Sequence, residues 1–238
     1  MNPQTHEDDP YPAVPAHSWC VKTVPLGRAA IAGIAAAAGF PLVIAILDVV
    51  QRDFLIQTDP RLDPLVSNPV SAHELGPYGL AQHLNFLLTG LLVGLFGEGL
   101  YRALPRSHWA RATRIALIVL GFGIALGVFT LDVANTQTWH GRIHAVGFLI
   151  LVFASMVVPF VLAAALLRNP RVRWLVWLAL GVGIATVVVV FVPNPKGSYS
   201  NWFGPASKLH LLITFGFLEA IAIWLWTSGR SQATRLGT

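Results

Sequence analysis

The chain has 238 residues, of which 55% are hydrophobic and only 11% are charged, and its formal net charge is +5. Soluble domains carry about 25% charged residues, so this composition excludes a cytoplasmic enzyme, a nucleic-acid-binding domain and a disordered protein. It leaves an integral membrane protein, for which lipid is the solvent of most side chains. The single cysteine, Cys20, excludes an intrachain disulfide and thiolate metal sites.

The chain opens with a polar, proline-rich segment, 1–28, which predicts a mobile cytoplasmic tail. Six apolar segments follow, and each is long enough to cross a hydrocarbon core of about 30 Å as a helix. They cover residues 29–50, 80–101, 112–131, 143–167, 172–192 and 209–227. The sequence therefore predicts an all-α fold, a six-transmembrane-helix bundle over 29–228, with a short cytoplasmic tail at 229–238. Small residues such as Gly90 and Gly94, which form a GxxxG motif, predict close packing between helices.

The Lys and Arg residues set the orientation, because cytoplasmic loops carry an excess of them. Eleven of the 16 fall on one side of the predicted helices: Lys22, Arg28, Arg102, Arg106, Arg111, Arg114, Arg168, Arg171, Arg173, Arg230 and Arg235. This bias predicts a multi-pass protein of the cell membrane with both termini in the cytoplasm.

Polar residues gather at the opposite, outer depth. With this topology, the outer ends of five helices carry acids or histidines, together with an asparagine and a lysine. These residues are Asp48, His83, Asn85, Asp132, His140, His144, Lys208 and His210. Ionisable residues in membrane helices are costly and point to function by default. We therefore expect a polar pocket that opens towards the outer leaflet and is roofed by the loops 51–78 and 193–208.

A metal site is one interpretation of this cluster. His140 and His144 are four residues apart and share one face of a helix, a spacing that suits two imidazoles on one zinc ion. His83 or His210 could supply a third ligand, and Asp132 could orient or deprotonate a bound water. The plainer interpretation is that His144 hydrogen-bonds Asp132 as a structural pair, and haem ligation or a proton relay are further alternatives.

Acid–base chemistry without a metal is the other interpretation. A carboxylic acid in an apolar pocket can be held protonated and donate its proton, so Asp132 or Asp48 could act as general acid while His144 relays the proton. Ser71 and Ser155 have no partners in sequence that suggest a triad, so we predict no serine nucleophile. The candidate substrate-binding residues are His83, Asn85, Trp139, Trp202 and Phe203. The three aromatic residues also fit an interfacial aromatic belt.

Three segments of the chain carry a family resemblance: NPVSAHELGPYGLAQHLNFLLTGLLVGLFGEGLYRAL, GFGIALGVFTLD and TQTWHGRIHAVGFLILVFASMVVPFVLA. Over residues 67–165 the chain resembles the membrane family called domain of unknown function 998. The matching positions are Ser71, His83, Asn85, Phe86, Phe129, Asp132, Gly141 and His144. FTLD stands here where the family has an FPTD-like sequence. The resemblance implies six membrane helices and a role for Asp132 and His144, and it implies no particular activity.

Together these features predict a membrane-embedded enzyme whose His/Asp site acts on a lipid or isoprenoid-like substrate. The reaction would be metal-dependent hydrolysis or acid–base chemistry such as cyclisation. The alternative is a non-catalytic lipid-binding or structural protein whose polar cluster ties the helices together. The expected partner in either case is a membrane lipid or another apolar small molecule, and not a nucleic acid. A transporter is the weakest interpretation, because no inverted repeat is visible.

Overall fold

The computed structural model describes residues 23–58, 69–132, 137–191 and 199–236. Within them the regular elements are helices, and six are long and apolar enough to cross a membrane, which confirms the predicted bundle. These six are α1 (Thr23–Val50), α3 (Gly79–Ala103), α4 (His108–Ala125), α5 (Trp139–Leu166), α6 (Arg173–Phe191) and α7 (Tyr199–Leu236). Shorter elements lie in the connections: α2 (Arg52–Thr58), η2 (Val70–Leu75), η3 (Leu126–Val128) and η4 (Pro170–Val172).

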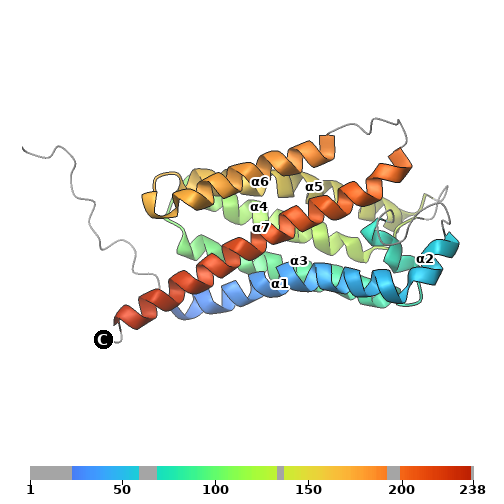
Figure 1. Ribbon diagram of the computed structural model, residues 1–238, viewed down its shortest axis with the longest axis horizontal. Coiled ribbons are helices and arrows are strands. Elements are labelled where there is room, and N and C mark those ends of the chain that lie inside the picture. Colours follow the sequence, from blue (N-terminus) through green and yellow to red (C-terminus); the bar gives the residue numbers. More distant parts are fainter. Residues whose placement is uncertain (1–22, 59–68, 133–136, 192–198, 237–238) are drawn as a thin grey trace, which may run out of the picture.

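The six long helices close into a ring. Each packs against its neighbours in sequence, and α7 packs against α1 as well as α6. Figure 1 shows α7 running obliquely across the front of the bundle between these two helices. Because consecutive helices run in opposite directions, the ends of α1, α4 and α6 meet the beginnings of α3, α5 and α7 at one end of the bundle. Residues far apart in sequence therefore converge at that end.

Large aromatic side chains fill the centre of the bundle. Phe40, Phe96 and Phe215 come from three different helices and are at most 2% exposed. The rings of Phe40 and Phe215 stack with their centroids 4.6 Å apart. The surface is apolar in its turn: Leu80 on α3 is 72% exposed and Ile115 on α4 is 61% exposed. Such exposure suits contact with lipid tails.

Close approach of α3 and α4 depends on glycine. A Cβ atom added to Gly90 would collide with the backbone carbonyl of Gly121, and one added to Gly121 would collide with that of Gly90. The backbones can meet only because neither residue has a side chain. The packing interpretation is therefore confirmed at Gly90, whereas a Cβ at Gly94 would meet nothing within 4 Å.

The boundaries differ from the sequence prediction at several places, and α7 begins at Tyr199, so the predicted roof loop 193–208 is helical from 199 onwards. α1 begins at Thr23, so 23–28 of the predicted tail is helical, whereas 1–22 lies outside the described residues. α7 continues to Leu236, through most of the predicted C-terminal tail. The third span was predicted to reach 131, but α4 ends at Ala125, a short 3-10 turn follows, and Phe129 is extended with φ −81° and ψ 127°. Asp132 therefore lies in a connection beyond the helix.

Candidate functional site

Buried polar side chains collect where the chain turns at one end of the bundle. We call this region the polar end and define it by Asp48, His73, Glu74, His144 and Lys208. They come from α1, η2, α5 and α7, and η2 packs against α1, α3 and α7. His73 is 0% exposed, Glu74 6%, His144 7% and Asp48 8%. The convergence predicted from the sequence is present, and η2, within the predicted roof 51–78, contributes two of its members.

Asp48 joins three elements through its carboxylate. The Lys208 ammonium donates to both carboxylate oxygens at 2.9 Å, which ties α7 to α1. The His73 Nε2 atom lies 3.1 Å from Oδ1, although its N–H does not point along that line. The Gln51 amide donates to the His73 carbonyl at 3.2 Å and holds η2 on the end of α1. Because Lys208 compensates its charge, Asp48 suits an ionic link better than a proton donor.

Glu74 is the most unusual titratable group at the polar end. Its side chain is 0% accessible, and Oε2 accepts a hydrogen bond from the Leu131 backbone N–H at 2.9 Å. Oε1 lies 3.6 Å from His144 Nδ1 and accepts no hydrogen bond within the described residues. Burial raises the pKa of the Glu74 carboxyl to about 8, and the Leu131 hydrogen bond offsets only part of that rise. The group is therefore largely a protonated acid at neutral pH.

His144 is held by the segment that follows η3. Its Nδ1 atom lies 2.7 Å from the Phe129 carbonyl oxygen, which fixes Nδ1 as the protonated nitrogen of the neutral ring. The ring also meets Phe86 edge-on, with centroids 6.3 Å apart. The Phe129 carbonyl and the Leu131 N–H are both satisfied by side chains, so the chain can leave the helix before Asp132 without losing hydrogen bonds. The structure therefore places His144 beside Glu74 at the polar end.

Asp132 fixes the start of α5. It accepts hydrogen bonds from the Thr138 backbone N–H at 3.1 Å and from the Thr138 hydroxyl, and Thr138 in turn caps the helix by accepting from the Gly141 N–H. The Thr138 hydroxyl is the main reason that the pKa of Asp132 lies below its usual value. The predicted Asp132–His144 pair is replaced by Asp132–Thr138. An acid that is ionised at neutral pH is poorly suited to donate a proton, so Asp132 fits an anchoring role and Glu74 fits the acid.

The predicted metal ligands His140 and His210 have hydroxyl partners of their own. His140 Nδ1 lies 2.8 Å from the Thr138 hydroxyl, and His210 Nε2 lies 2.8 Å from the Ser155 hydroxyl. His83 Nδ1 forms no hydrogen bond with the described residues. Among those residues, no three His, Cys, Asp or Glu side chains are arranged to hold a metal ion. The described residues therefore give the predicted zinc site no support.

Ser155 has a partner that the sequence did not reveal. Its hydroxyl lies 2.8 Å from His210 Nε2, across α5 and α7, and the two residues are 55 positions apart. The same hydroxyl also lies 2.8 Å from the Val152 carbonyl oxygen, to which it donates as serines in helices commonly do. The contact with His210 joins α5 to α7.

The candidate substrate-binding residues fall into different settings. Asn85 donates to the Phe40 carbonyl at 3.3 Å and to Gln82 at 3.4 Å, so it already joins α3 to α1. Trp139 is 67% exposed at the start of α5, with its ring centroid 5.9 Å from that of Phe129. The side chains of Trp202 and Phe203 lie outside the described residues.

Sequence reasoning missed the importance of His73 and Glu74, although both stood in a segment assigned to the roof. Their only local signal was an adjacent pair of ionisable residues between the apolar Val70 and Leu75.

Comparison with known proteins agrees with this architecture. Residues 34–224 match the family model described as protein of unknown function (DUF998). No curated protein and no solved structure matches the chain. Because the matched region includes all six membrane helices in whole or in part and the whole polar end, this chain belongs to the DUF998 family, whose function is unknown.

Proposed function

We propose that the protein is a membrane-embedded acid–base catalyst that acts on a lipid or isoprenoid-like substrate at the polar end. The observation that carries this proposal is the pair formed by Glu74 and His144. Glu74 is a buried acid whose pKa lies near 8, and His144 Nδ1 is 3.6 Å from it. General acid–base catalysis works best when the catalytic group titrates near the working pH.

The two residues would divide the proton transfers between them. Glu74 would give its proton to a double bond or an oxygen of the substrate, and the carboxylate left behind would keep the Leu131 N–H as its donor. His144, whose Nδ1 is bonded to the Phe129 carbonyl, would present Nε2 as the base that removes a proton elsewhere on the same molecule. One proton enters and one leaves, so isomerisation or cyclisation needs no oxidant or reductant.

The membrane setting favours an apolar substrate. Leu80 and Leu84, in the first turns of α3 beside the polar end, are 72% and 47% exposed. A lipid-soluble molecule can therefore approach from the bilayer. The excess of arginine at the other end favours a cell-membrane protein with both termini in the cytoplasm and the polar end towards the outer leaflet.

A non-catalytic lipid-binding or structural role is the second candidate, because many of the polar groups already bond to the backbone of another element. Gln51 donates to the His73 carbonyl, Asn85 donates to the Phe40 carbonyl, and Glu74 accepts from the Leu131 N–H. Such contacts tie helices together without any chemistry.

The test compares the wild-type protein with Glu74→Gln, which keeps the shape of the side chain and its acceptor oxygen but cannot transfer a proton. Each protein would be incubated with vesicles made from the total lipid extract of the cells that produce it, and the lipids would be compared by mass spectrometry. Asp53→Asn, an exposed acid on α2, serves as the matched control.

We expect a lipid species to be converted by the wild type and Asp53→Asn and not by Glu74→Gln, with unchanged folding at neutral pH. Full conversion by Glu74→Gln would overturn the assigned acid. No conversion by the wild type, together with a large loss of thermal stability in Glu74→Gln, would favour the structural role.

A further inference from the structure

A hollow lies at the arginine end of the bundle, opposite the polar end. It has a volume of about 460 Å³ and is lined by the end of α3, the α3–α4 connection and the start of α4. Its lining residues are Tyr101, Arg102, Leu104, Arg106 and Arg111. We call it the arginine hollow. Its size falls within the range of small-molecule sites, and nothing in the acid–base proposal uses it.

The charge around the arginine hollow is not balanced by acids. Glu98 accepts hydrogen bonds from Arg102 at 3.1 and 3.2 Å, and its second oxygen lies 2.7 Å from Arg114 Nε. One carboxylate therefore serves two guanidinium groups. Within the described part of the chain, neither Arg106 nor Arg111 forms an ion pair, and both are exposed. Two guanidinium groups beside one hollow are thus left for an anion.

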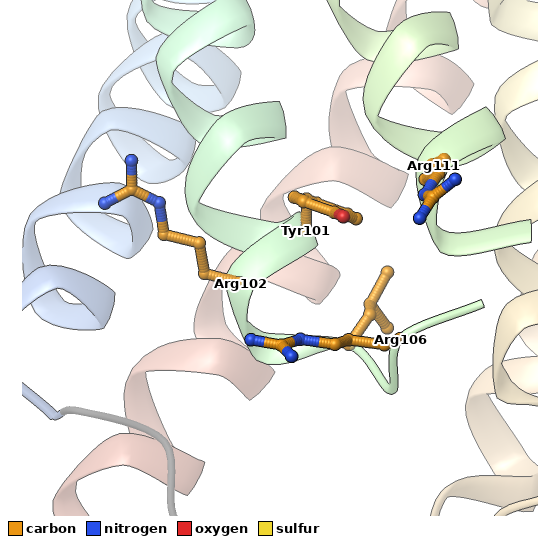
Figure 2. Close-up of a pocket in the computed structure, with 5 residues that line it drawn as sticks. Tyr101, Arg102, Arg106 and Arg111 are labelled. Carbon is orange, nitrogen blue, oxygen red and sulfur yellow. The ribbon is translucent and has the colours of Figure 1, made fainter. Parts of the chain in front are cut away.

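Tyr101 and Arg111 face each other across the hollow, and Arg106 lines its lower edge. Figure 2 shows the Tyr101 hydroxyl directed towards Arg111, whereas the Arg106 side chain runs beneath the end of α3 with its guanidinium group turned away from Arg111, and Arg102 points to the opposite side of α3. Arg114 lies over the Tyr101 ring, 5.3 Å from its centroid, and helps to fix it. The buried Leu104, which is 5% exposed, forms an apolar wall. The hollow therefore combines two free cations, one hydroxyl and an apolar side.

We propose that the arginine hollow binds the phosphoryl group of an anionic membrane lipid. A guanidinium group matches the oxygens of a phosphate with two parallel hydrogen bonds, and basic pockets between membrane helices suit such headgroups.

A lipid suits the hollow better than a soluble phosphate because apolar surface begins beside it. Trp109, in the first turn of α4, is 43% exposed, as expected for a residue at the membrane interface. Further along the same helix, Ile115 is 61% exposed and Phe122 is 58% exposed. The acyl chains of a lipid held by its headgroup can lie along this surface.

Arginine at this end is also expected from the excess of Lys and Arg in the cytoplasmic connections of membrane proteins. A second connection of this chain serves as a control for that general excess. The α5–α6 connection carries Arg168 and Arg171, both exposed, and neither lines the arginine hollow. A diffuse attraction to anionic lipid would depend equally on the two connections. A built site depends on Arg106 and Arg111 alone.

The experiment measures binding of phosphatidic acid, phosphatidylglycerol and phosphatidylcholine to the full-length protein by native mass spectrometry. The double variant Arg106→Gln/Arg111→Gln is compared with the matched double variant Arg168→Gln/Arg171→Gln. We expect the first to lose phosphatidic acid affinity by about 10-fold or more, as the loss of charge-assisted hydrogen bonds requires. The second stays within about 2-fold of the wild type, and phosphatidylcholine binding is unchanged in both.

Three controls complete the design. Tyr101→Phe, which keeps every charge, is expected to weaken binding by a few-fold. If both double variants lost affinity for phosphatidic acid equally, the proposed site would be wrong and binding would reflect a diffuse attraction between arginine and anionic lipid. If inorganic phosphate or glycerol phosphate displaced phosphatidic acid at an equal concentration, the ligand would be a soluble phosphate and the proposed lipid ligand would be wrong. Equal thermal stability of the two double variants would exclude misfolding as the cause of a loss.

Discussion

Replacing Glu74 with glutamine changes how the stability of the protein depends on pH. The Glu74 side chain is 0% accessible, and its pKa is raised from 4.5 to about 8 by burial. The folded protein therefore holds a proton that the unfolded chain releases between these values. A group with a raised pKa contributes its full stability below 4.5, and that contribution is lost as the pH rises through about 8.

The magnitude follows from the size of the shift. One pKa unit corresponds to about 1.4 kcal/mol, so the whole shift corresponds to roughly 5 kcal/mol at alkaline pH. Between about pH 6 and pH 8 the Glu74 carboxyl alone lowers the free energy of unfolding by about 2 kcal/mol. In Glu74→Gln this loss is absent, because the amide does not titrate and can still accept from the Leu131 N–H.

The assay is unfolding in mixed micelles, followed by circular dichroism at several pH values for both proteins. The two proteins differ only at position 74, so the difference between their two curves isolates the contribution of the Glu74 carboxyl. Asp53→Asn, which removes an exposed carboxyl, should follow the wild type. Parallel pH curves for the wild type and Glu74→Gln would refute the reasoning, as would a wild type that gains stability over this range relative to the variant.

Three further predictions concern the polar end. Gly141→Ala places a Cβ against the Asp132 carboxylate and should destabilise the protein by about 1–3 kcal/mol in a thermal melt. Gly181→Ala is the control: its added Cβ meets nothing within 4 Å, so this variant should be neutral or slightly stabilised. Lys208→Met leaves the Asp48 carboxylate without its cation and should cost about 3 kcal/mol, and adding Asp48→Asn should restore part of that loss in a double-mutant cycle. Because the pKa of Asp132 is depressed, the wild type should lose stability as the pH falls below 3.8, and Asp132→Asn should lack that acid-side loss when both are titrated with acid.

The number of membrane helices and the convergence of polar residues could be predicted from the sequence, because both depend on local properties. Apolar length identifies a span, and the alternation of directions then assigns each helix end to a side. Lys208 and Asp48 were accordingly expected at one depth. Their direct contact was not, because no local signal relates positions 160 residues apart.

The part of the site that was missed depends on tertiary packing. Glu74 lies in a six-residue 3-10 helix that has no room for a hydrophobic period, and its burial results from packing against α1, α3 and α7. The role of Asp132 was misjudged for a related reason. α4 ends early, and the carboxylate meets Thr138, which lies outside the predicted fourth span.

The ion pair between Lys208 and Asp48 has a consequence for synthesis of the protein. It joins the first and last membrane helices across 160 residues. At a translation rate of about 5–20 residues per second, α1 enters the membrane on the order of 10 s before its lysine exists. During that interval the Asp48 carboxylate lacks the Lys208 ammonium with which it later pairs, so the nascent chain lacks both this ion pair and the packing of α7. A chain that stops before α7 would keep this uncompensated acid permanently, and we expect its membrane helices to be less stable than those of the finished protein.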